Sequence, residues 1–69
     1  MSQYVMYKHY YILHCVFNDH GKTKTQLIKV PSINIMYDKF IVVDKQHNHK
    51  VWINIDNVVE VEDIIEDLM

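Results

Sequence analysis

The chain has 69 residues, a formal net charge of −2 and an apolar fraction of 49%. This length allows a single domain spanning residues 1–69, and the apolar fraction excludes a disordered chain and indicates a packed core. The only cysteine is Cys15, which excludes an intramolecular disulfide framework and a cysteine-rich zinc site. Packing alone must hold this small domain together, so we expect a homo-oligomer as one way of burying more surface.

Composition also bears on compartment and origin. No stretch approaches the ~18 consecutive apolar residues of a membrane-spanning helix, so we expect no membrane partner. The N-terminal residues lack the basic region and apolar run of a secretion signal, and a free thiol suits a reducing compartment. The chain has no alanine or arginine and is rich in Ile, Lys, Asn and Tyr, whose codons are AT-rich. These features predict a cytoplasmic protein in a bacterial host.

Alternating side chains predict a long first strand over residues 4–17. Apolar residues occupy both of its faces beyond Tyr10, which is typical of a central or strongly curved strand. The polar segment 18–22 follows, and Gly21, the only glycine, lies where a hairpin turn needs a positive φ angle. A second strand is expected over residues 23–30, because Pro31 cannot donate a hydrogen bond to a β-ladder.

The middle of the chain predicts a second hairpin. Residues 32–38 alternate weakly and fit either a short edge strand or a loop. Residues 39–44 form a strand, the polar segment 45–50 forms a loop, and a further strand covers residues 51–55. The alternation places four side chains of this hairpin in the core: Ile41, Val43, Ile53 and Ile55.

The C-terminal segment fits two patterns. Val59 and Val61 continue the apolar face of the preceding strand, whereas Val61, Ile64, Ile65 and Leu68 have the spacing of a helix stripe. Adjacent β-branched residues weigh against a long helix, so we predict a strand over residues 58–62 and at most one or two helical turns after it. The fold class is therefore mainly β: a small antiparallel sheet, or a five-stranded SH3-like or Sm-like barrel, with a short C-terminal helical turn.

No pattern of residues points to catalysis, and we expect no enzyme activity and no cofactor. His14 and Cys15 are neighbours on a strand and point apart, which excludes a nucleophile and its base. Glu60 and Glu62 share one face of a strand, which is typical of a solvated face. A single glycine cannot form a phosphate-binding loop.

Five histidines raise the question of a metal site. His47 and His49, in one predicted loop, could approach His20 in another if both loops lay at the same end of a barrel. A His-x-His pair without further ligands is a weak signal, however, and His9 and His14 fall on opposite faces of the first strand. The sequence therefore predicts no metal site.

Charge is distributed unevenly along the chain. Residues 1–50 hold all seven lysines and three aspartates, whereas residues 51–69 hold six acidic residues and no basic one. Three interpretations remain open. The acidic end can simply keep the chain soluble, can dock on a partner with a basic surface, or can meet the lysine-bearing face of a second copy.

Aromatic residues supply a second set of candidates. Tyr4, Tyr7, Tyr10 and Tyr11 lie near Lys8, an arrangement that can stack nucleotides, but the lack of arginine and the negative charge weigh against a nucleic-acid partner. Tyr7 and Tyr11 share a strand face with Leu13 and are expected in the core. Interfaces favour exposed aromatic and methionine side chains.

Together these observations favour a non-enzymatic protein-interaction module, encoded by a phage or other mobile element, that binds and inhibits a host protein. The candidate partner-binding residues are Glu60, Glu62, Asp63, Glu66 and Asp67 in the acidic end and the exposed Tyr10, Met36, Tyr37 and Trp52. The alternative is an oligomeric, Sm-like ligand binder that contacts a nucleotide or single-stranded RNA.

Overall fold

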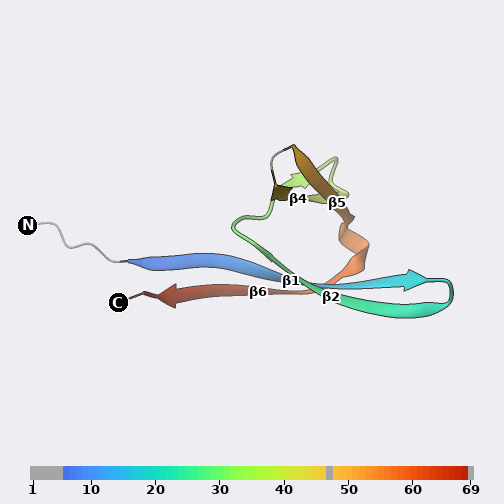
Figure 1. Cartoon of the computed structure of the whole chain (residues 1–69), viewed down its shortest axis with the longest axis horizontal. Helices are drawn as coiled ribbons and strands as arrows, with labels where there is room; N and C mark the ends of the chain where they lie inside the picture. Colours follow the sequence, from blue (N-terminus) through green and yellow to red (C-terminus); the bar gives the residue numbers. More distant parts are fainter. Residues whose placement is uncertain (1–5, 47, 69) are drawn as a thin grey trace, which may run out of the picture.

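The computed structural model describes residues 6–46 and 48–68, which form a mainly β structure of two antiparallel sheets (Figure 1). No α-helix occurs within these two ranges. The elements are β1 (Tyr7–Asp19), β2 (Lys22–Val30), β3 (Ile35–Met36), β4 (Phe40–Gln46), β5 (His49–Asn54), a 3-10 turn η1 (Ile55–Asn57) and β6 (Val58–Asp67). The predicted β class is confirmed.

The first sheet has the order β2-β1-β6, with β1 in the centre as the apolar character of both its faces predicted. β1 pairs with β2 from Tyr11↔Val30 to Asp19↔Lys22. The two-residue turn between them contains His20 and Gly21, both with positive φ angles, which suits a hairpin whose strands twist to the right. Residues 4 and 5, where the predicted first strand begins, lie outside the described ranges.

The second sheet has the order β3-β4-β5 and contains the predicted hairpin, but β4 runs to Gln46 and β5 begins at His49, so most of the segment 45–50 predicted as a loop is strand. β4 and β5 pair with Ile41 opposite Ile53 and Val43 opposite Val51. Of the two interpretations of residues 32–38, the short edge strand is correct, although β3 has only two residues. A tight turn at Tyr37 and Asp38 leads from β3 into β4.

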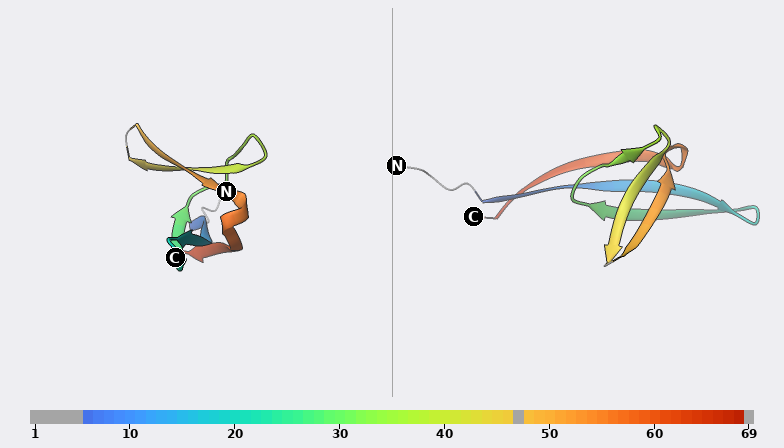
Figure 2. Two further views of the ribbon diagram at one scale, coloured as in Figure 1. Left: turned by 90° about the vertical axis from the view of Figure 1, so that its right-hand side faces the viewer. Right: turned by 90° about the horizontal axis from the view of Figure 1, so that it is seen from above.

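The core lies between the two sheets, where the inward faces of β1, β2, β4 and β5 meet. The buried residues are Leu13, Cys15, Ile28, Val30, Ile41, Val43 and Ile53. Three of the four predicted core residues of the hairpin are therefore buried, and the fourth, Ile55, is half-buried against this cluster. Tyr11 also packs against it, whereas Tyr7 is exposed, because β1 extends past the second sheet at that end (Figure 2).

Two further details of the sequence prediction are wrong. The C-terminal segment continues as strand to Asp67 and forms no helical turn; pairing with β1 up to Tyr7↔Asp67 satisfies its backbone groups in place of the helix. The helical turn lies instead at η1, between β5 and β6, where the Asn54 side chain accepts a hydrogen bond from the Asp56 backbone N–H at 2.9 Å. The described strands also form no closed barrel, since each pairs only within its own sheet.

The molecule is elongated, with extents of 58 × 24 × 22 Å. At one end β1 and β6 continue as a two-stranded ribbon, and at the other the β1–β2 hairpin projects past the second sheet (Figures 1 and 2). The part of the chain that the structure describes has no helix suited to crossing a membrane.

Candidate functional site

Three predicted partner-binding residues come together on the outer face of the second sheet. These three residues are Met36, Tyr37 and Trp52. Together with the neighbouring Phe40 we call them the aromatic patch. The Trp52 ring centre lies 6.0 Å from that of Tyr37 and 5.8 Å from that of Phe40. Met36 pairs with Phe40 across β3 and β4. Strand alternation produces the patch: Ile41 and Ile53 point into the core, so their neighbours point outward.

A groove of about 490 Å³ adjoins the aromatic patch. Five of its eight lining residues are apolar: Ile33, Ile35, Met36, Val42 and Trp52. Asp44 and Lys50, which face each other across β4 and β5, also line it. A groove that combines apolar side chains with polar ones at its edge can accept an apolar side chain of a partner and orient it.

Tyr37 has an unusual backbone for a residue so exposed. Its φ angle is +56° and that of Asp38 is +52°, in a turn of the type that prefers asparagine and glycine. A left-handed conformation costs about 1–2 kcal/mol for a residue with a side chain. Tyr37 is nevertheless 78% exposed, so burial of its ring within the chain does not offset that cost. Strain of this kind is concentrated at binding and catalytic sites.

The acidic residues of β6 divide between two faces. Glu60, Glu62 and Glu66 lie on the outer face of the first sheet, whereas Asp63 and Asp67 lie on the opposite face. Carboxylates on both faces already contact histidines of β1: the His9–Asp63 distance is 2.6 Å and the His14–Glu62 distance is 2.6 Å. The five residues therefore do not form one continuous acidic surface.

Tyr10, the remaining candidate, lies on the outer face of the first sheet, away from the aromatic patch. Its hydroxyl donates a hydrogen bond to Glu66 at 3.3 Å, and the Lys29 Nζ lies 4.2 Å from its ring centre. Desolvation and the Glu66 carboxylate raise the pKa of Tyr10. A hydrogen-bonding contact with Lys8 and the repulsion from its charge lower the pKa of Lys29. Two close ammonium groups beside an aromatic ring can attract an anion.

The histidines are distributed differently from the loop cluster that the sequence suggested. His20, at the β1–β2 turn, lies far from the ends of β4 and β5 that flank the second loop, and His47 lies outside the described ranges (Figure 1). His9 and His14 do fall on opposite faces of β1, as predicted. His14 points toward Glu60 and Glu62, and this cluster was missed because no local pattern links residues 46 positions apart.

Cys15 is buried in the core, and His14 lies on the outer face, so the two neighbours point apart as predicted. Burial raises the pKa of the Cys15 thiol.

Comparison with known proteins gives no relative: no protein family, curated protein or solved structure matches the chain.

Proposed function

We propose that this chain is a non-enzymatic protein-interaction module, encoded by a phage or mobile element, which docks on a host protein through its aromatic patch and inhibits it. The observation that carries the proposal is Tyr37: a large, exposed aromatic residue held in a strained turn beside Trp52. Tyrosine and tryptophan dominate the binding energy of protein interfaces, because they bury a large area and lose little conformational entropy.

The acidic residues of β6 support docking on a host protein less directly. Glu60, Glu62 and Glu66 face away from the second sheet, so a partner lying flat on the aromatic patch does not touch them. The charge of β6 would act at longer range, by attracting a partner with a basic surface. The groove beside Trp52 would take an apolar side chain of that partner.

The test compares a double variant of the aromatic patch, Tyr37→Asn with Trp52→Ala, with a control variant outside the patch. Tyr37→Asn relieves the strained turn, so we expect its thermal stability to equal or exceed that of the parent, even though the ring contact with Trp52 is lost. Combined with Trp52→Ala it should abolish partner binding. Tyr7→Ala, which removes an exposed tyrosine at the far end of β1, is the matched control and should bind like the parent.

The measurement has two stages. Proteins retained from a bacterial lysate by the immobilised parent and by Tyr7→Ala, and lost with the double variant, are identified by mass spectrometry. Each is then purified and titrated calorimetrically against all three chains. If a partner binds the parent and the double variant with equal affinity, the aromatic patch is not the docking surface. If the lysate yields no specific protein, the result contradicts the proposal that this chain binds a host protein.

The arrangement of Tyr10 beside Lys8 and Lys29 favours the second candidate function, binding of a nucleotide or single-stranded RNA. Lys8 and Lys29 could contact phosphate while Tyr10 stacks on a base. Glu66 opposes this, because its carboxylate binds the Tyr10 hydroxyl and repels an anion. RNA retained from the same lysate, and lost with Lys29→Gln but not with the aromatic-patch variant, would favour this function over protein docking.

A further inference from the structure

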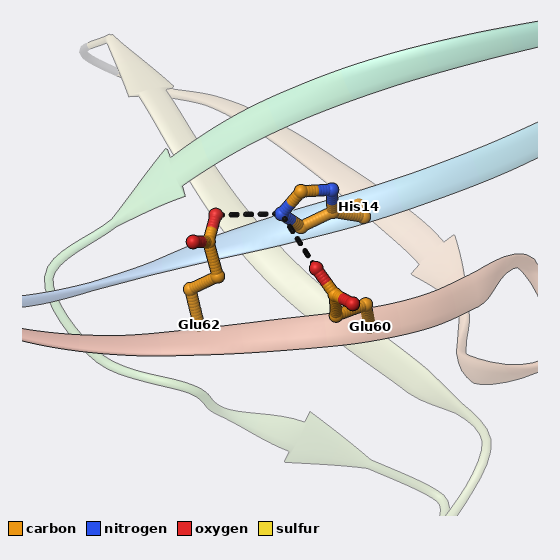
Figure 3. A network of polar contacts seen from close by, with 3 residues as sticks. All are labelled: His14, Glu60 and Glu62. Atoms are coloured by element: carbon orange, nitrogen blue, oxygen red, sulfur yellow. Dashed lines mark hydrogen bonds and ion pairs between the residues drawn. The ribbon is translucent and has the colours of Figure 1, made fainter.

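Three side chains with metal-binding atoms converge on the outer face of the first sheet (Figure 3). The His14 Nε2 atom lies 2.6 Å from Glu62 Oε2 and 3.3 Å from Glu60 Oε2, and the candidate ligand atoms all lie within 4.8 Å of one another. Figure 3 shows the imidazole between the two carboxylates, which reach it from the neighbouring strand. We propose that His14, Glu60 and Glu62 bind one divalent transition-metal ion, with zinc the best fit.

One separation in the cluster already has the value found in a zinc site. Zinc bonds to nitrogen and oxygen of about 2.0–2.2 Å place tetrahedral ligand atoms about 3.3 Å apart. The His14–Glu60 separation of 3.3 Å already has this value. The shorter His14–Glu62 contact must open by about 0.7 Å to reach it. The Glu62 side chain is exposed and has several rotatable bonds, so it is free to adjust.

The sheet itself fixes this arrangement. His14 lies directly opposite Glu60 in the β1–β6 pairing, and Glu62, two residues further along β6, points to the same face. The register shifts next to His14, where β6 carries Val59 as an extra residue before Cys15 meets Val58. Bulges of this kind redirect neighbouring side chains and are common beside functional sites. The ligands are therefore carried by paired strands and not by loops.

Charge also favours a cation at this point. Two carboxylates meet one imidazole, and a single imidazole neutralises at most one negative charge. The second carboxylate then repels the first. A divalent ion between the three groups compensates both carboxylates while the imidazole binds through a neutral nitrogen.

The ligand set indicates the class of ion. Imidazole nitrogen suits zinc and its neighbours among the transition metals, whereas calcium and magnesium prefer six or more oxygen ligands. Three protein ligands leave one tetrahedral position, which water can fill because both glutamates are exposed. We therefore infer a solvent-accessible zinc site, independent of the aromatic patch on the other sheet.

The test measures zinc binding by the full chain without an affinity tag, using competition with a coloured chelator. We expect one zinc ion per chain, with affinity reduced at least tenfold by Glu60→Gln or Glu62→Gln and at least a hundredfold by His14→Gln. Asp63→Asn and His20→Gln are matched controls: Asp63 pairs with His9 on the opposite face, and His20 lies at the β1–β2 turn. Neither control should change the affinity.

A second measurement separates binding from folding. At one fixed zinc concentration, the thermal midpoint of the parent and of Asp63→Asn should rise equally and that of Glu60→Gln should rise less, since an ion stabilises a chain less when it binds more weakly. An excess of magnesium or calcium should not displace the zinc. The proposal fails if micromolar zinc does not bind, if the three cluster variants bind as the parent does, or if binding is lost only when His47 and His49 are replaced.

Discussion

His14 and Cys15 are adjacent in the sequence and occupy opposite environments. The His14 ring reaches the carboxylates of β6 on the outer face, while the Cys15 side chain is 1% exposed among the apolar residues between the sheets. The period of two along a strand separates the pair, and the core position makes Cys15 a packing residue. Leu13, fully buried on the same face of β1, has the same role.

The Cys15 thiol should be inert in the folded protein. Burial raises its pKa, so less of the reactive thiolate is present at neutral pH, and reagents cannot reach the sulfur. We expect Ellman's reagent to modify it only as fast as the protein unfolds, and at an ordinary thiol rate in denaturant. Rapid modification under native conditions would show that the core opens between the sheets.

At the scale of the element, the β4–β5 hairpin depends on which side of each strand faces inward. The predicted register placed Ile53 in the core and Trp52 outside, and the structure has the same arrangement. In the antiparallel pairing Ile53 lies opposite Ile41, which is also buried. A slip of one residue would have put Trp52 in the core and removed the aromatic patch.

The register predicts that replacing isoleucine by alanine reduces the free energy of unfolding much more at a core site than at an exposed one. Ile53 is 4% exposed and Ile65, on the β1–β6 ribbon, is 67% exposed. Ile53→Ala should reduce the free energy of unfolding by about 2–5 kcal/mol, because it leaves a cavity in the core. Ile65→Ala should cost less than about 1 kcal/mol. Urea denaturation of both variants measures the difference, and equal costs would contradict the described core.

At the scale of the whole molecule, the extended shape leaves much of the first sheet without cover. The radius of gyration is 15.1 Å, whereas a compact chain of this length has about 11 Å. Val61 and Ile65 are exposed on β6, and Tyr7 is exposed on the strand that pairs with it. Two-stranded ribbons are only marginally stable alone, so a second copy would stabilise this part of the molecule.

We therefore expect self-association in which acidic β6 of one copy meets the lysine-bearing β2 of another. Light scattering after size exclusion should show a dimer or larger species at low salt, with dissociation as salt screens the charges. The triple variant Asp63→Asn, Glu66→Gln and Asp67→Asn should be more monomeric, while the zinc ligands Glu60 and Glu62 stay in place. A monomer at all salt concentrations and at high protein concentration would contradict this expectation.

Much of the local structure follows from the sequence alone. Alternation identified the long first strand, the β4–β5 hairpin and three of its buried residues, because a side-chain period of two is a property of each strand. Gly21 marked the first turn, since its positive φ angle suits glycine. Met36, Tyr37 and Trp52, chosen as interface candidates because interfaces favour aromatic and methionine side chains, are exposed in the structure.

Tertiary structure decided which strands pair, and with that the site. Val61, Ile64, Ile65 and Leu68 have the spacing of a helix stripe, and only the ladder with β1 made residues 63–67 part of the strand. The same pairing brings His14 to Glu62, 48 residues away, and turns a solvated acidic face into a candidate zinc site. Each strand pattern shows which faces are apolar but not which partner it meets, because that choice depends on contacts between distant segments packed around one core.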